Sequence, residues 1–267
     1  LNPTSAMTGD AFRAVVTNTS GSAQSLSASL SIVVGTAVST YVGSPGASGT
    51  TDGTGDAARF NGPAGTVVDA LGNLYVADTS NHVIRKVAPG GVVTTLAGQP
   101  GVSGSADGVG SAARFNSPSG VAVSTVGTVY VADTYNHTVR AIAPDGTVTT
   151  VAGLAGNTGS TDGTGSAARF LYPYGVAVDN TGTIYVADTF NHTIRRIQSG
   201  AIVTTFAGTA GQRGTTDALG VSARFAFPFA VVADAAGSIY VADTFNHTIR
   251  KIDFSSNGST LAGTGGT

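Results

Sequence analysis

The 267-residue sequence contains no cysteine and no glutamate, and only 10% of its residues are charged, against about 25% in an average globular protein. The lack of cysteine excludes disulfides and thiol nucleophiles. The lack of glutamate fits a chain with few long helices, because Glu favours helix whereas Asp favours turns and caps. A net charge of -2 gives no basic surface for nucleic acid. No apolar run approaches the ~20 residues of a membrane-spanning helix.

With so few ions, the surface must be covered by Ser, Thr, Asn and Gly. This composition is commoner in secreted bacterial proteins than in cytosolic ones, so we expect a bacterial protein that is extracellular or located at the cell surface. The sequence shows no signal peptide or lipidation motif, and it does not begin with Met. It therefore reads as a fragment or a processed form.

One motif recurs four times and organises the chain. The third copy runs from Tyr185 to Arg195 as Tyr-Val-Ala-Asp-Thr-Phe-Asn-His-Thr-Ile-Arg, and successive copies are 55 residues apart. A period kept so strictly marks a repeat architecture. Apolar and alternating runs separated by Gly, Asn and Ser predict four strands in each copy, followed by a long crossover, as in a propeller blade. In the third copy these predicted strands are 175–179, 183–188, 192–197 and 202–208.

The crossovers repeat as well. Residues 166–170 are expected to form one turn of helix, with Asp162 or Ser166 capping free backbone N–H groups. In the fourth copy Ala218 and Leu219 replace the Gly-Thr or Gly-Val of the others, so a glycine that requires positive φ would be missing there. One aromatic residue ends each crossover and is expected to wedge between neighbouring blades: Phe60, Phe115, Phe170 and Phe225.

The motif Tyr-Val-Ala-Asp-Thr-x-Asn-His-x-Ile-Arg resembles the NHL-repeat family over residues 36–267. The resemblance implies an all-β fold, a β-propeller of ~55-residue four-stranded blades, usually six in number. Four copies mean a partial ring or a ring closed with four blades. Residues 37–43 and 258–263 are both predicted to form an outer strand, although a closed ring needs only one of these two strands. A longer array or an exchanged strand would account for both.

Residues 1–35 lie outside the repeat. Alternation around Phe12 to Val16 and around Leu26 to Ile32, with a turn at 20–22, predicts a β-hairpin. It resembles the last two strands of a bacterial immunoglobulin-like domain, with Phe12 where that family has its corner tyrosine. A lone hairpin is marginal in water. It is either a domain remnant without a function of its own, or a strand donor that assembles an extracellular fibre or array.

The polar residues of the motif are of types that occur in active sites. We nevertheless predict a structural role for them, because residues that recur in every blade are needed to form each blade. Their imidazoles lie on separate blades and away from the axis, so no metal site is predicted. The blade-structural set is Asp78, Asn81, His82, Arg85, Asp133, Asn136, His137, Arg140, Asp188, Asn191, His192, Arg195, Asp243, Asn246, His247 and Arg250.

A second repeated charge set lies in the crossovers. Its carboxylates belong to Asp-Gly-x-Gly segments, which weakly resemble calcium-binding loops. Each segment has a single carboxylate, however, whereas a calcium-binding loop brings several oxygen ligands together. We therefore predict an Asp–Arg or Asp–backbone clamp between blades. The set comprises Asp52, Asp107, Asp162 and Asp217 with Arg59, Arg114, Arg169 and Arg224.

Recognition is expected where equivalent positions differ between copies. The residues flanking the proline before each inner strand are small in the first two copies and aromatic in the last two, where Tyr172, Tyr174, Phe227 and Phe229 form a candidate ligand-binding set. These rings either receive a ligand or pack on one another or on a further blade. A similar gradient at the turn positions predicts a second exposed apolar strip. Its members are Ser80, Tyr135, Phe190 and Phe245.

These observations predict a non-catalytic scaffold for binding or assembly, with a protein or carbohydrate partner or with self-association. Enzymes on related propellers place metal ligands and acid–base groups at the axis, so a hydrolase or lyase with an axial metal is the alternative. This sequence offers no Glu and no His outside the repeat. Accordingly we predict no catalytic residue, no metal and no cofactor.

Overall fold

The computed structural model describes residues 11–12, 15–18, 21–24, 28–29 and 38–264. The chain divides into two compact units, Leu1–Thr40 and Tyr41–Thr267. Within the described residues no helix has the length and hydropathy needed to cross a bilayer.

The first unit contains short antiparallel strands. In one pair, Val15 lies opposite Gln24 and Asn18 opposite Gly21, and in a second, separate pair Ala11 lies opposite Ser29. This is the predicted hairpin, although Leu26, Leu30 and Ile32 of its second half lie outside the described residues. The immunoglobulin-like assignment and the role of Phe12 stay predictions. The strands are β1 (Ala11–Phe12), β2 (Val15–Asn18), β3 (Gly21–Gln24) and β4 (Ala28–Ser29).

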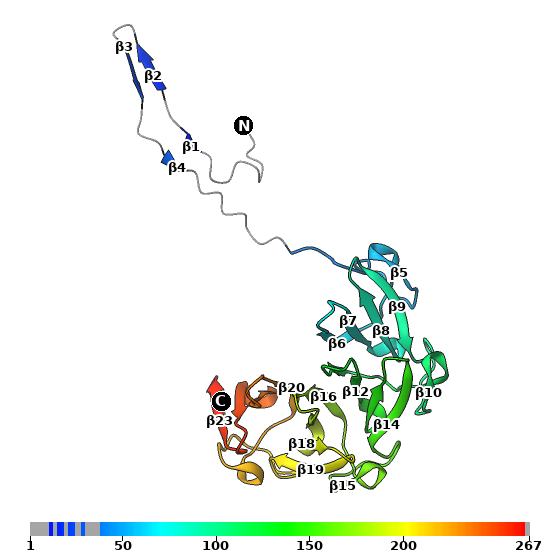
Figure 1. The fold of residues 1–267 in the computed structure, drawn as a ribbon. Helices are drawn as coiled ribbons and strands as arrows, with labels where there is room; N and C mark the ends of the chain where they lie inside the picture. The colour runs from blue at the N-terminus through cyan, green and yellow to red at the C-terminus, as the bar shows by residue number, and fades with distance from the viewer. Residues whose placement is uncertain (1–10, 13–14, 19–20, 25–27, 30–37, 265–267) are drawn as a thin grey trace. The chain divides into compact units, whose positions relative to one another are not determined.

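The second unit is an all-β propeller of four blades, as the repeat predicts (Figure 1). Each blade is an antiparallel meander whose strands pair in chain order. Blade one contains β6 (Pro63–Val68), β7 (Leu74–Asp78), β8 (Val83–Ala88) and β9 (Val92–Ala97). Blade two contains β11 (Gly120–Val123), β12 (Val129–Asp133), β13 (Thr138–Ile142) and β14 (Thr147–Gly153). Blade three contains β16 (Pro173–Val178), β17 (Ile184–Asp188), β18 (Thr193–Gln198) and β19 (Ile202–Ala207). Blade four contains β20 (Pro228–Ala233), β21 (Ile239–Asp243), β22 (Thr248–Ile252) and β23 (Gly258–Ala262).

Blades one to three gain a short fifth strand that the sequence did not predict. It comes from the preceding crossover and pairs with the outer strand of its own blade. A Cβ at Gly53 would lie 3.2 Å from the Ala57 Cβ, so glycine fits this tight segment. Blade four has Ala218 there and keeps only an isolated bridge from Leu219 to Asn257. The fifth strands are β5 (Gly53–Thr54), β10 (Gly108–Val109) and β15 (Gly163–Thr164).

Single 3₁₀ turns occupy two positions of the repeat. A crossover turn was predicted over residues 166–170 and is observed at Gly165–Ala167, with Ala168 already extended. Its predicted capping was wrong, because no side chain caps this turn and Asp162 instead accepts hydrogen bonds from Arg195 and Thr205. The crossover turns are η2 (Gly55–Ala57), η4 (Gly110–Ala112), η6 (Gly165–Ala167) and η8 (Gly220–Ser222). The turns between second and third strands are η3 (Thr79–Asn81), η5 (Thr134–Asn136), η7 (Thr189–Asn191) and η9 (Thr244–Asn246).

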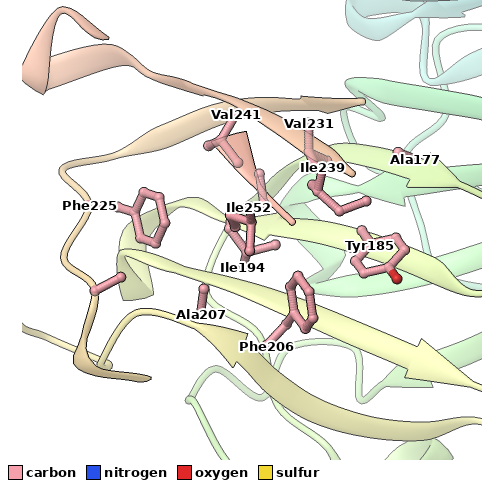
Figure 2. Close-up of a cluster of buried hydrophobic side chains, with 12 residues drawn as sticks. Ala177, Tyr185, Ile194, Phe206, Ala207, Phe225, Val231, Ile239, Val241 and Ile252 are labelled. Carbon is pink, nitrogen blue, oxygen red and sulfur yellow. The ribbon is translucent and has the colours of Figure 1, made fainter. Parts of the chain in front are cut away.

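The buried apolar residues gather between blades rather than within them. Between blades three and four, Tyr185, Ile194 and Phe206 pack with Ile239 and Ile252 (Figure 2). The crossover phenylalanines take the predicted wedge position. Phe170 is 0% exposed, and its Cδ2 lies 3.1 Å from where a Cβ at Gly153 of the preceding blade would stand. Phe115 and Phe225 repeat this arrangement against Gly98 and Gly208.

The segment before blade one is not the outer strand that was predicted for residues 37–43. Val42 and Gly43 have no strand pairing, and Ala37 lies outside the described residues. Val42 nevertheless packs against the core of blade one, and a Cβ at Gly43 would lie 3.3 Å from Phe60 Cδ2. The segment thus supplies a Phe socket without forming a strand.

Neighbouring inner strands approach so closely that their central residue must be glycine. A Cβ at Gly120 would lie 2.3 Å from the Tyr174 carbonyl oxygen, and one at Gly175 would lie 2.8 Å from that of Phe229. Blade four has exposed Ala230 at this position. Its outward face is also open, since Ile249 is 41% exposed whereas the equivalent Ile194 is 0% exposed. The four blades therefore form a partial ring.

Candidate functional site: an aromatic strip across three blades

The charged residues of the motif form a buried network inside each blade. In blade two, Arg140 is 0% exposed, and its Nη1 donates to Asp133 Oδ2 at 2.9 Å while its Nη2 donates to Asp107 Oδ1 at 2.6 Å. The same guanidinium also donates to the carbonyl oxygens of Arg114 and Ala106. The network holds the crossover against the third strand.

The buried carboxylate of this network is fully surrounded by donors. Asp133 accepts hydrogen bonds from Asn116 N, Asn136 Nδ2 and Arg140. Burial, only partly offset by these donors, raises the pKa of Asp133 to about 6, and likewise that of Asp188. Asp133 and Arg140 are both 0% exposed, so this pair lies inside the blade.

The predicted clamp between blades is wrong. Asp107 pairs with Arg140 of its own blade, and its side chain is 49% exposed. Arg114 does not pair with Asp107. Its Nη1 instead donates to the carbonyl oxygens of Ser111 and Ala113 at 2.6 and 2.7 Å. The acidic crossover residues therefore fasten each crossover to its own sheet.

Thr and His of the motif join each blade to the next. Thr134 Oγ1 donates to the Pro173 carbonyl at 2.7 Å, and the Tyr172 backbone N–H donates to His137 Nδ1 at 3.2 Å. His82 and His192 accept the equivalent bonds. Each acceptor imidazole must be neutral at Nδ1. Burial lowers the pKa of His82, His137 and His192, which favours that state.

This joint predicts an acid-sensitive propeller. An unfolded histidine, with a pKa near 6.5, takes up a proton more readily than the folded one, so the free energy of unfolding should fall as pH decreases through about 6.5 toward the lower folded pKa. His137→Asn, which tolerates the left-handed backbone (φ 58°), should show a shallower decrease. The measurement is urea unfolding of wild type and variant at several pH values from about 8 to below 6.5. The difference between the two isolates the imidazole, because protonation of Asp133 and Asp188, which acts with the opposite sign around pH 6 and below, is common to both.

The matched control is His247→Asn. Within the described residues His247 accepts no inter-blade hydrogen bond, so this variant should keep the wild-type pH dependence. An identical slope in wild type and His137→Asn would contradict the role given to the inter-blade imidazoles.

Five aromatic rings form one continuous strip along the edge where these turns lie. Rings from the 3₁₀ turns alternate with rings that precede the inner-strand prolines, and successive centroids are 5.3, 5.1, 5.1 and 4.8 Å apart. The turn rings are the more open, at 52%, 41% and 62% exposed for Tyr135, Phe190 and Phe245. We call this set the aromatic strip: Tyr135, Tyr172, Phe190, Phe227 and Phe245.

Two members of the strip are held in a backbone conformation that bulky residues rarely adopt. Tyr172 and Phe227 have φ of 48° and 49°, where blade one has Gly62 and blade two has Ser117. A large side chain in this region is strained, and such strain concentrates at functional positions. The inter-blade histidines support the rings from below, with His137 and His192 at 4.5 Å centroid distance from Tyr172 and Phe227. The aromatic side chains are thus placed at a cost to the backbone.

The structure divides the four predicted ligand-binding residues into two pairs. Tyr172 and Phe227 belong to the aromatic strip, whereas Tyr174 and Phe229 contact each other at 4.7 Å and line a cavity of about 270 Å³ among the inner strands. The turn rings do not make a separate second strip, because they interleave with Tyr172 and Phe227.

The inner-strand cavity carries little chemistry for catalysis. Besides Tyr174, whose pKa is raised by burial, its lining consists of apolar residues, glycines, Thr66 and Ser119. Among the described residues no three His, Cys, Asp or Glu side chains come together as metal ligands would. This lining offers no general acid or base of ordinary pKa.

Comparison with known proteins identifies the repeat. The NHL repeat family matches residues 60–86, 115–142 and 170–197, so the chain carries NHL repeats on a propeller fold. It is 31% identical over 241 residues to Protein SUPPRESSOR OF QUENCHING 1, chloroplastic, of Arabidopsis thaliana, covering 84% of this chain and 23% of the relative. It is 30% identical over 254 residues to NHL repeat-containing protein 2 of Bos taurus, covering 81% and 34%. The chain thus spans a quarter to a third of these relatives.

A solved structure shares the fold. Selenomethionine-substituted virginiamycin B lyase from Staphylococcus aureus matches with a TM-score of 0.53 and 14% identity, over 75% of this chain and 55% of that one. The match shows the propeller architecture. At this low identity it gives no information about the activity of this chain.

Proposed function

We propose that the propeller is a non-catalytic binding scaffold and that the aromatic strip receives a protein partner through an extended segment with apolar side chains. The observation that carries the proposal is the strip itself: five adjoining rings, two of them in strained backbone, on a surface where blade one has only Ser80 and Gly62. Exposed aromatic residues of this kind dominate the energetics of protein recognition.

A peptide fits the strip better than a sugar does. Edge-to-face packing at 77° and 84° makes neighbouring rings cover parts of one another, so no wide flat platform is open for a pyranose face. Sugar hydroxyls also need polar partners, but the nearby Asp133 and Asp188 are 0% exposed. The guanidinium of Arg213 lies over the strip, 5.5 Å from the Phe227 centroid, and it suits a peptide carbonyl or carboxylate.

The test selects phage-displayed random peptides on the immobilised propeller and measures their affinity by calorimetry. Blade one supplies the replacement residue, so the triple variant Tyr135→Ser, Phe190→Ser, Phe245→Ser copies Ser80 and should remain folded. Selected peptides should be rich in apolar residues, and the variant should weaken binding at least roughly 30-fold, the effect of losing one hot-spot ring of about 2 kcal/mol.

Phe254→Ser is the control, because Phe254 is 81% exposed and lies at the other end of its blade. It should leave the affinity unchanged. Equal binding by wild type and the triple variant, or binding only to a glycan array, would overturn the proposal.

We propose an extracellular or cell-surface setting and a bacterial origin as well. The sequence relatives do not supply these two points, since they come from a plant and from vertebrates. The axial lyase or hydrolase and a fibre assembled through the β2–β3 hairpin remain the alternatives. Neither has a specific observation in its favour comparable to the strip.

A further inference from the structure

A cleft of about 590 Å³ lies between blades one and two, at the end of the strands opposite the aromatic strip. Ligand sites in proteins typically measure about 300–1,000 Å³ and are lined mostly by apolar side chains with a few polar groups. This cleft has that character. Its apolar lining includes Val68, Leu96, Val123, Val129, Ile142 and Pro144.

The polar groups of the cleft lining include the Lys86 ammonium, the Asp69 carboxylate and the side chains of Asn73 and Ser124. Lys86 Nζ lies 5.9 Å from the Tyr75 ring centroid, and no ion pair among the described residues includes it. The nearby carboxylate of Asp69 is occupied by its own turn and strand, since it accepts hydrogen bonds from Leu71 N, Asn73 N, Asn73 Nδ2 and Tyr75 Oη. Those donors lower the pKa of Asp69 against its desolvation and keep it satisfied.

Between blades three and four the same position is filled by the chain itself. Phe206 replaces Leu96 there and is 6% exposed, with its ring 5.2 Å from that of Tyr185. Arg196 replaces Lys86 and lies 5.4 Å over the Phe206 ring. The interface between blades three and four thus shows that this position accommodates an apolar ring next to a cation. Between blades two and three the cation is lost, because Ala141 occupies it.

We propose that the cleft between blades one and two binds a small amphipathic monoanion. Its apolar body, a ring or a short alkyl chain, occupies the place that Phe206 fills in the other interface. Its carboxylate accepts a charge-assisted hydrogen bond from Lys86, which is stronger than a bond between neutral groups. The site is independent of the aromatic strip and adds a small-molecule ligand to a protein-binding scaffold.

The test compares octanoate with 1-octanol by isothermal titration calorimetry on the whole chain, below the micellar concentration. Octanoate should bind with one site and about tenfold more tightly than octanol, the effect of one charge-assisted hydrogen bond. Lys86→Met should remove this preference and leave octanol binding unchanged. No heat with octanoate, or equal affinity for both ligands in the wild type, would overturn the proposal.

Leu96→Phe tests the location, because it copies the residue that fills the equivalent position between blades three and four. It should abolish binding of both ligands while near-ultraviolet circular dichroism shows an intact fold. Unchanged octanoate affinity in this folded variant would place the ligand elsewhere and contradict the site. The triple serine variant of the aromatic strip should bind octanoate like the wild type, which separates this result from the peptide-binding proposal.

Discussion

Replacing Arg140 with methionine is expected to lower the free energy of unfolding by about 3–5 kcal/mol, the usual cost of breaking a buried ion pair by removing one partner. The substitution leaves Asp133, which is 0% exposed, without its cation. It also removes the donors that satisfy the carbonyl oxygens of Arg114 and Ala106. Urea denaturation followed by circular dichroism measures the effect.

Arg114→Met is the matched control, since it removes the same charge in the same blade. Arg114 donates to two carbonyl oxygens of its own turn and to the exposed side chain of Gln99, and it has no carboxylate partner, so the loss should stay within about 1 kcal/mol. Equal decreases in the free energy of unfolding in the two variants would contradict the stabilising role given to the buried ion pair of Arg140.

Phe170→Ala is expected to destabilise the propeller by about 3–5 kcal/mol, as for other fully buried aromatic residues. The ring is 0% exposed, fills the socket formed by Gly153 of the preceding blade, and lies 5.3 Å under the Arg195 guanidinium. Its loss leaves a cavity at the joint of blades two and three. Thermal and urea unfolding both report this loss.

Phe254→Ala provides the comparison, because this ring is 81% exposed and its removal should change the free energy of unfolding by less than about 0.5 kcal/mol. If Phe170→Ala were equally mild, the crossover phenylalanines could not be the wedges that hold blades together.

The strands could be predicted because their hydrophobic pattern and turn residues repeat without slippage. The predicted strand 202–208 is observed as Ile202–Ala207, and 183–188 as Ile184–Asp188. The fifth strands were missed because two residues such as Gly53–Thr54 carry no hydrophobic pattern of their own. They form only because the crossover folds back onto its blade.

Pairing across the sequence was harder to predict than secondary structure. Asp107 lies nearer in sequence to Arg114 than to Arg140, yet it pairs with Arg140, because the crossover returns past the third strand of the blade. The aromatic strip was predicted in separate parts for a similar reason. Only the offset between blades brings the turn ring Tyr135 to 5.3 Å from Tyr172 of the next blade.

The repeated and the varying residues of this chain have separate places in the structure. Asp133 and Arg140 are buried inside a blade, whereas Tyr135 and Phe190 are open at its edge. We therefore propose that the constant Asp, Thr, Asn and His of this turn serve the blade, whereas its varying third residue, such as Tyr135 or Phe190, belongs to the binding surface.

The central claim is that recognition belongs to the varying rings of the aromatic strip. The most direct test is the dissociation constant of a selected peptide for the folded triple variant Tyr135→Ser, Phe190→Ser, Phe245→Ser. We predict an increase of at least roughly 30-fold over the wild type, with the near-ultraviolet spectrum of a folded propeller retained. An unchanged dissociation constant in the folded variant would contradict the claim.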